Sequence, residues 1–309
     1  MIFAVLKSHM YPCPRTHFLH VKKLAEGFIQ RGYHFTVLDS LRELDYLSTD
    51  DILYISNHFS TEKYLMPLRN ILLENLLNSL HVCRAQKILW NFHTCGDPSL
   101  FDNFSKDVLH LGEDIDPLYL RKEPLLQNFR EKVDVHRLKY GAPLHPDSVD
   151  FSVPIHNTDM NFIGAGYKRH LTEHARTNYN SIIYNTPPKV SEPLRINSFK
   201  NARLNLVFHS DSNIEKGIIV ERFAEALAYG NFIAHDHPHI EELTKGFHFA
   251  RKVQHESDID LFISDIKSMS SFQKAGAIKQ ARNMFISEGF SYYAQADSIL
   301  QKLRIDTKK

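Results

Sequence analysis

Residues 204–236 carry the sequence LNLVFHSDSNIEKGIIVERFAEALAYGNFIAHD. Its first part, Leu204–Phe208, is apolar enough for a buried strand, and a polar loop follows at 209–217. Ile218–Tyr229 then repeats apolar side chains at helical spacing, and Asn231–Ala234 is a second apolar strand. A strand, a helix and a strand in this order predict a parallel sheet with a right-handed crossover.

The same alternation extends towards both ends of the chain. A strand at Ile2–Leu6, a proline-containing loop and a helix at His17–Arg31 lead to a strand at Tyr33–Leu38. The other expected strands are Asp51–Ser56, Lys87–Phe92, Val108–Leu111, Met160–Ile163 and Ile182–Tyr184, and the other expected helices are Met66–Leu80, Asp258–Met269, Ser271–Ser287 and Tyr292–Leu303. This pattern predicts an α/β protein with open parallel sheets, whose ligands bind at the carboxyl ends of the strands.

A stretch rich in glycine and proline, Tyr140–Asn157, interrupts the alternation and marks a linker. We therefore expect two Rossmann-like domains facing each other across a cleft. The N-terminal domain is expected at residues 1–145 and the C-terminal domain at 146–290. The last segment, 291–309, is expected to be a helix that crosses back to the N-terminal domain.

Composition narrows the class of protein. The 309 residues have a formal net charge of +1, from 37 Lys and Arg against 36 Asp and Glu, so no long-range attraction to nucleic acid or anionic lipid is expected. Three widely separated cysteines argue against a disulfide framework. No signal peptide or membrane-spanning stretch is recognisable, and we expect a cytoplasmic protein. The 19 histidines are scattered without metal-site spacing.

The predicted helix at 218–229 offers groups that suit a nucleoside diphosphate. Lys216 or Arg222 can neutralise the diphosphate, and the guanidinium matches two oxygens at once. Glu225 can accept hydrogen bonds from both ribose hydroxyls, and the preceding loop adds the hydroxyl of Ser210 and the amide of Asn213. An ordinary amphipathic helix with solvated charges has the same pattern, so the residues alone leave both interpretations open.

A resemblance favours the donor-site interpretation. The stretch Arg222–Asp236, followed by the acidic-hydrophobic turn His239–Leu243, is similar to the donor segment of GT-B glycosyltransferases, and most similar to their group-1 and spore-maturation (CgeB-like) branch. The resemblance implies that Glu225 binds the ribose and that Arg222 lies near the diphosphate. Retaining members often carry a second glutamate eight residues earlier, where this chain has Gly217, so the stereochemistry of transfer is left open.

Two other segments agree with this family. Asp159–Arg169 resembles the first strand and turn of the GT-B C-terminal domain, which implies that Gly164 and Gly166 let the backbone approach the donor phosphates and that Arg169 lies beside them. A lone Gly-x-Gly also occurs in ordinary tight turns. His20–Leu38 resembles the first helix and second strand of the N-terminal domain, which indicates a fold and not an activity.

The acceptor side is expected in the N-terminal domain. His93 and Asp97 follow a predicted central strand, in a segment that resembles the corresponding turn of CgeB-like enzymes, and either side chain can deprotonate an acceptor hydroxyl. Asp97 before Pro98 fits a simple turn equally well. His17 and His20 are weaker candidates beside the expected cleft. Cys95 lacks the partners of a thiolate site.

The predicted activity is transfer of a sugar from a nucleotide-sugar, such as a UDP or GDP sugar, to an acceptor hydroxyl, without a further cofactor. Neither of the Asp-x-Asp pairs, at 114–116 and 258–260, follows a convincing strand in the donor half, so metal-independent transfer is favoured. Three alternatives stay open: a phage-type DNA-modifying glycosyltransferase, which the even charge disfavours, a GT-B-type sugar-nucleotide epimerase, and a non-catalytic nucleotide-sugar binding module. The acceptor, a glycan, lipid-linked or other hydroxyl, and the oligomeric state are not determined by the sequence.

Overall fold

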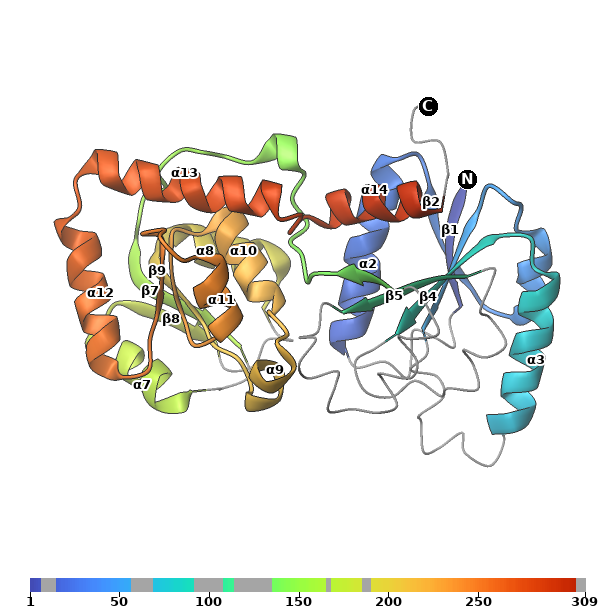
Figure 1. Cartoon of the computed structure of the whole chain (residues 1–309), viewed down its shortest axis with the longest axis horizontal. Helices are drawn as coiled ribbons and strands as arrows, with labels where there is room; N and C mark the ends of the chain where they lie inside the picture. Colours follow the sequence, from blue (N-terminus) through green and yellow to red (C-terminus); the bar gives the residue numbers. More distant parts are fainter. Residues whose placement is uncertain are drawn as a thin grey trace. The chain divides into compact units, whose positions relative to one another are not determined.

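The computed structural model describes residues 1–6, 15–56, 69–91, 108–113, 135–164, 168–184 and 190–303, with the side chains of 15–20, 56, 69–74, 77, 90, 91, 110, 112, 113 and 135 excepted. These residues form two compact units, each with its own parallel sheet (Figure 1). Unit 1 comprises Met1–Lys139 together with Tyr292–Lys309, and unit 2 comprises Tyr140–Ser291. The two α/β units with parallel sheets confirm the predicted fold class.

The sheet of unit 1 has the strand order β2-β1-β3-β4-β5-β6, and every neighbouring pair is parallel. Its strands are β1 (Ile2–Leu6), β2 (His34–Leu38), β3 (Ile52–Ser56), β4 (Gln86–Asn91), β5 (Val108–Glu113) and β6 (Val135–Leu138). The helices are α2 (Arg15–Gln30), α3 (Arg69–Val82) and α14 (Tyr292–Lys302), with a 3-10 helix, η1, at Leu41–Tyr46. The alternation of strands and helices is what a parallel sheet requires, because each parallel connection must cross over the sheet.

The C-terminal helix α14 packs against α2 and completes the core of unit 1. Tyr292 and Ala296 are buried with Leu24 and Phe28 of α2 in one apolar cluster. The approach is close because α2 carries Gly27 at the contact. A Cβ atom on Gly27 would lie 2.7 Å from the carbonyl oxygen of Tyr292 and 2.8 Å from Cβ of Ala296.

We expect the substitution Gly27→Ala to lower the free energy of unfolding of unit 1 by about 1–3 kcal/mol, because backbone atoms cannot move away without separating the two helices. Gly276→Ala in α13 is the matched control, since a Cβ atom there meets nothing within 4 Å. That change should stabilise the helix by about 0.5–1 kcal/mol. Urea unfolding of both variants measures the difference, and equal effects would contradict the close approach of α2 and α14.

The sheet of unit 2 has the order β11-β10-β9-β7-β8 and is also parallel throughout. Its strands are β7 (Thr158–Ile163), β8 (Ser181–Tyr184), β9 (Ala202–Val207), β10 (Phe232–His235) and β11 (Ala250–Lys252). The helices are α7 (Arg169–Asn178), α8 (Glu192–Asn201), α9 (Asp211–Lys216), α10 (Glu221–Tyr229), α11 (Pro238–Leu243), α12 (Glu256–Ser268) and α13 (Ser271–Ser287), with a 3-10 turn, η4, at Pro146–Ser148. No helix among the described residues is long and apolar enough to span a membrane.

Helix α10 lies in the core of unit 2. All residues from Phe223 to Tyr229 are buried, including the charged Glu225, and α10 contacts α8, α13, β9 and β10. The helix ends at Gly230, where a Cβ atom would lie only 2.5 Å from Nδ2 of Asn205 in β9. Gly230 therefore permits a close approach between the end of the helix and the central strand β9.

Several short elements were not predicted from the sequence: α7, α8, α11, β6 and β11. Helix α7 buries only Leu171, Thr172 and Ala175, and β11 has three residues. Such short segments bury too few side chains to show a clear apolar period, so their conformation depends on packing against neighbours.

Candidate functional site

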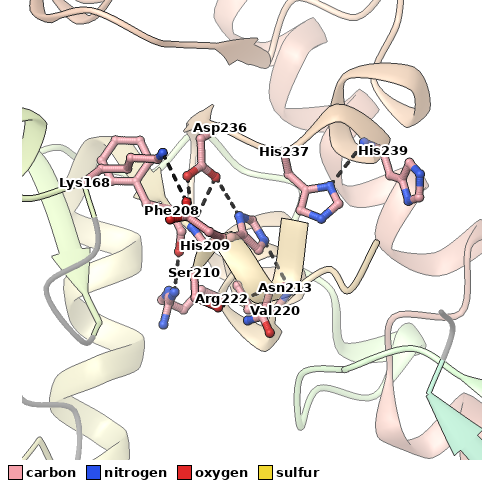
Figure 2. Close-up of polar contacts among 11 residues, drawn as sticks. Lys168, Phe208, His209, Ser210, Asn213, Val220, Arg222, Asp236, His237 and His239 are labelled. Carbon is pink, nitrogen blue, oxygen red and sulfur yellow. Dashed lines mark hydrogen bonds and ion pairs between the residues drawn. The ribbon is translucent and has the colours of Figure 1, made fainter. Parts of the chain in front are cut away.

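The carboxyl ends of β7, β9 and β10 lie side by side in unit 2, and polar residues follow β9 and β10 (Figure 2). Gly164 follows β7, the segment 208–210 follows β9, and Asp236 with His237 follows β10. These three strands are neighbours in the sheet and run parallel, so the segments after them meet at one edge. This is the edge at which open α/β sheets bind their ligands.

His209 is the centre of the polar network at this edge. Its ring Nδ1 lies 2.8 Å from a carboxylate oxygen of Asp236, and its backbone N–H donates to the same carboxylate at 3.1 Å. The backbone N–H of Val220 donates to the ring Nε2 at 3.3 Å. Because Nε2 accepts a hydrogen bond, the ring is neutral and carries its proton on Nδ1, towards Asp236.

The segment 209–217 was predicted as a loop, and this prediction is wrong in part because the segment contains the short helix α9. The hydroxyl of Ser210 caps this helix by accepting from the backbone N–H of Asn213 at 3.2 Å. Gly217 ends it with a φ of 72°, in the left-handed region that favours glycine. Lys216 is buried in the last turn. The sequence signal for α9 was therefore capping, Ser210 at one end and Gly217 at the other, and not apolar periodicity.

Two cationic side chains lie near the ends of β7 and β9. Nη2 of Arg222 donates to the carbonyl oxygen of Phe208 at 2.5 Å, and its guanidinium lies 5.8 Å from the centre of the Phe162 ring. Lys168 has a left-handed backbone, with a φ of 51°, and its ammonium lies 3.8 Å from the carboxylate of Asp211. Figure 2 shows Lys168 and Arg222 around the segment 208–210.

Glu225 does not lie on an open surface of α10. Its side chain is 1% exposed and forms an ion pair with Arg195 of α8, with 2.6 Å between Nη2 and Oε1. The second terminal nitrogen of the Arg195 guanidinium, Nη1, lies 3.9 Å from the carboxylate of Glu221, which precedes Glu225 by one turn of α10. A buried carboxylate needs an opposite charge to stay ionised, and Arg195 supplies it. The role of Glu225 towards ribose stays a prediction, and its carboxylate has a protein partner already.

Three buried histidines make this edge sensitive to acid. Burial lowers the pKa of His209, although the Asp236 carboxylate opposes the shift. Burial, followed by repulsion from His209, lowers the pKa of His235 to about 3 and that of His237 to about 4. The rings of His209 and His237 are only 4.6 Å apart between centroids, so both must be neutral in the folded protein near neutral pH.

We expect the free energy of unfolding of unit 2 to fall as the pH is lowered from about 6.5 towards 4. The unfolded state binds protons at histidine near pH 6.5 whereas folded His235 and His237 do not, so acid favours unfolding. Each histidine contributes a slope of at most about 1.4 kcal/mol per pH unit in this window. His235→Met should reduce the slope relative to the wild type. An unchanged slope in His235→Met would contradict the assignment.

The other predicted site residues are distributed as follows. Gly164 is buried after β7, and a Cβ atom there would lie 2.6 Å from the Phe162 ring. Arg169 begins α7, where its side chain is 84% exposed and 3.9 Å from Glu173. Gly166, His93 and Asp97 lie outside the described residues, as do Cys95 and the pair 114–116, and His17 and His20 lie in α2 where side chains are not described.

The acidic pair at 258–260 has structural contacts. Asp258 accepts from the backbone N–H groups of Gln254 and His255 and so caps α12. Asp260 accepts from the hydroxyl of Tyr179 at 2.5 Å and lies 2.7 Å from Nε2 of His174. In the part of the chain that the structure describes, no group of three or more His, Cys, Asp or Glu side chains is arranged to hold a metal ion.

Four residues of this site were not predicted as site residues from the sequence: His209, Asp236, Lys168 and Arg195. A signal existed for two of them, because His209 directly follows the predicted strand 204–208 and Asp236 follows the predicted strand 231–234. Polar residues directly after two neighbouring parallel strands meet at one sheet edge. Arg195 gave no comparable signal, because it lies in α8, a helix that the sequence pattern did not predict.

The sequence matches no protein-family model, and no curated protein matches it. Solved structures do match. An α,α-trehalose-phosphate synthase (UDP-forming) from Burkholderia vietnamiensis aligns with 96% of this chain and 79% of its own, at 10% identity and a TM-score of 0.50. An α,α-trehalose 6-phosphate synthase from Burkholderia multivorans aligns with 94% of this chain and 76% of its own, at 9% identity and a TM-score of 0.49. An α1,3-fucosyltransferase aligns with 99% and 90%, at 11% identity and a TM-score of 0.42.

At such low identity the match to the Burkholderia vietnamiensis synthase concerns the fold alone. It extends over nearly the whole chain and therefore includes both α/β units. It agrees with the two parallel sheets. The chain therefore has the GT-B glycosyltransferase fold.

Proposed function

We propose that the protein is a glycosyltransferase that moves a sugar from a nucleotide-sugar donor to an acceptor hydroxyl. The observation that carries this proposal is the position of Arg222, whose guanidinium lies at the carboxyl end of β9, hydrogen-bonded to Phe208, within a GT-B fold. The Burkholderia vietnamiensis protein of the same fold is a UDP-forming synthase, so UDP is the first nucleotide to consider. The resemblance of 222–236 to CgeB-like enzymes supports that branch within the fold.

The proposed chemistry uses cations of unit 2 to bind the donor. In the transfer, the bond between the anomeric carbon and the diphosphate oxygen breaks, a bond to the acceptor oxygen forms, and the nucleoside diphosphate leaves. The negative charge that develops on the leaving diphosphate is stabilised by fixed positive groups, for which Arg222, Lys168 and Lys216 are the candidates. The acceptor proton goes to a base, for which His93 and Asp97 remain the predicted groups.

Glu225 is the candidate for the ribose hydroxyls, and Ser210, Asn213, Gly164, Gly166 and Arg169 remain predicted donor contacts. The ion pair with Arg195 holds the Glu225 carboxylate in a fixed orientation, which suits an acceptor of two hydrogen bonds. Donor contact then requires the carboxylate to share its oxygens between Arg195 and ribose, or Arg195 to move. Metal independence and a cytoplasmic location stay predictions.

A thermal-shift screen tests the proposal. We expect UDP, GDP, CMP or dTDP, or one of their sugars, to raise the melting temperature, because a ligand that binds only the folded state stabilises it by about 2.7 kcal/mol at a hundred times its Kd. The nucleotide-sugar that binds is then incubated with and without candidate glycan and lipid-linked hydroxyl acceptors, and products are analysed.

The outcomes separate the candidate functions. A glycosylated acceptor supports transfer, whereas conversion of the sugar-nucleotide without an acceptor indicates an epimerase. Binding without turnover indicates a nucleotide-sugar binding module, and salt-dependent binding of duplex DNA with transfer to it indicates a DNA-modifying enzyme. No shift with any nucleotide would contradict a donor site in unit 2.

A further inference from the structure

We propose that His209 is a positioning residue that clamps the α9 excursion, defined as residues 210–219, and so fixes the groups proposed to bind the donor. The inference rests on the proposed function for its consequence in binding, but the clamp itself is a property of the fold. His209 is 1% exposed and therefore acts through its neighbours and not by contact with substrate.

The clamp consists of two hydrogen bonds that close the chain around the excursion. Two bonds join the chain just before the excursion to the chain just after it: Nε2 of His209 accepts from the N–H of Val220 at 3.3 Å, and Nη2 of Arg222 donates to the carbonyl oxygen of Phe208 at 2.5 Å. The two ends of the excursion are therefore held side by side (Figure 2). A loop whose ends are fixed loses conformational freedom along its whole length.

Asp236 anchors the clamp to the neighbouring strand. Its carboxylate accepts from both the backbone N–H and the ring Nδ1 of His209, at 3.1 and 2.8 Å, and it lies directly after β10. A side chain that is held from two sides keeps one rotamer, so the imidazole places Nε2 in one position relative to the sheet.

The clamp matters because of what the excursion and its flanks carry. Ser210 is the N-cap of α9, Asn213 lies in its first turn and Lys216 in its last turn. Arg222 lies in the first turn of α10. Val220 is the N-cap residue of α10 and has no capping side chain of its own. The acceptor that orients the start of α10 is therefore supplied by His209, from eleven residues earlier in the chain.

The clamp requires one protonation state and one tautomer. Val220 can only donate, so Nε2 must be unprotonated, and the carboxylate of Asp236 can only accept, so Nδ1 must carry the proton. A merely space-filling histidine has no such requirement. Long-range proton–nitrogen NMR spectra of the full chain labelled at histidine distinguish the two tautomers directly. We expect His209 to be the neutral Nδ1–H tautomer at pH 7, and the Nε2–H tautomer or an imidazolium would overturn the proposal.

Two substitutions of His209 separate the two hydrogen bonds of its imidazole, the one with Val220 and the one with Asp236. In His209→Gln the terminal amide reaches the place of Nε2 and keeps an acceptor for Val220, whereas in His209→Asn the shorter amide reaches the place of Nδ1 and keeps only the donor to Asp236. We expect hydrogen exchange in residues 210–221 to be at least about tenfold faster in His209→Asn than in the wild type, with a smaller increase in His209→Gln, which keeps the acceptor for Val220 but loses the ring donor to Asp236. Equal exchange in the two variants would overturn the clamp.

Nucleotide affinity provides the second measurement. With the nucleoside diphosphate that gives the largest thermal shift, His209→Asn should bind at least about tenfold more weakly than His209→Gln, because the donor groups on the excursion are no longer pre-organised. If the wild-type protein binds no nucleotide, the proposed function fails. The His209 tautomer and the hydrogen exchange of residues 210–221 then still test whether the clamp exists. If it binds and the two variants bind equally, the clamp fails and the function stands. Should His209→Asn not fold, the tautomer of the wild-type protein still decides.

Discussion

Replacing Arg282 with methionine is expected to lower the free energy of unfolding of unit 2 by about 3–5 kcal/mol. Arg282 lies in α13, is 2% exposed, and donates to the carbonyl oxygens of Leu227, Gly230 and Asp150. Two of these carbonyls are at the carboxyl end of α10, where backbone oxygens have no partner within the helix and the helix dipole favours a cation. Methionine fills most of the space but leaves all three oxygens without this donor.

The interaction is local to unit 2, and the measurement should report on that unit. Circular dichroism during urea unfolding detects the loss of helices in both units, whereas the fluorescence of the single tryptophan, Trp90, reports on unit 1 alone. A transition seen by circular dichroism and not by fluorescence is therefore that of unit 2. Arg176→Met is the matched control, since that guanidinium is 52% exposed and pairs with Glu173 on the same helix. Its loss should change stability by less than about 0.5 kcal/mol. A loss below about 1 kcal/mol in Arg282→Met would show that the buried guanidinium is not required at the end of α10.

Arg282→Lys refines the same prediction. Lysine keeps the positive charge but lacks the planar fork that reaches two carbonyls in one orientation. Burial lowers the pKa of Arg282 to about 10, and a lysine in the same place loses its proton more readily. We therefore expect a loss of stability between those of the wild type and Arg282→Met. Because the folded state releases the buried lysine proton at a lower pH than the unfolded state does, this loss should shrink as the pH rises through the pKa of the buried lysine.

Replacing Arg222 with methionine is expected to weaken binding of a nucleoside diphosphate by roughly 30- to 150-fold. This range corresponds to the loss of one charge-assisted contact, about 2–3 kcal/mol. Arg222 also holds the carbonyl oxygen of Phe208, so the substitution removes a phosphate partner and loosens the end of β9 together. Calorimetric titration with the nucleotide found by thermal shift gives the affinity.

Arg203→Met is the control for Arg222→Met. Arg203 lies near the amino end of β9 and pairs with Asp159 at 2.7 Å, so this substitution removes a guanidinium at the end of the strand opposite to Arg222. It should leave nucleotide affinity within about threefold. The loss in Arg222→Met should also shrink when a nucleoside replaces the diphosphate, because the contact is to phosphate. An equal loss for nucleoside and diphosphate would assign Arg222 to the fold alone.

The position of Glu225 changes how its role should be tested. Glu225→Ala leaves Arg195 in a largely buried place without its carboxylate, which destabilises the protein whether or not a donor binds there. Glu225→Gln keeps the volume and one acceptor oxygen and is the better variant. If Glu225 binds the ribose, the difference in affinity between a ribonucleotide and its 2′-deoxy analogue should be smaller in Glu225→Gln than in the wild type.

The elements with a strong local pattern were predictable from the sequence. Strand β1 has its predicted bounds, Ile2–Leu6, where a short continuous apolar run forms a buried strand. Helix α13 also has its predicted bounds, Ser271–Ser287, and begins directly after the capping residue Ser270. The segment 204–236 likewise predicted a strand, a helix and a strand in a parallel sheet, and β9, α10 and β10 have that order. Only the short capped helix α9 within it was missed.

The sequence by itself therefore determined the two α/β units, the parallel sheets and the segment that carries the candidate donor site. Periodicity and capping are local properties, which a window of ten to twenty residues contains in full. The tertiary structure alone decided which distant residue meets which: Arg195 with Glu225, Arg282 with the end of α10, and Gly27 with α14. Such pairs depend on the crossing of whole elements in the core, and no local pattern encodes them.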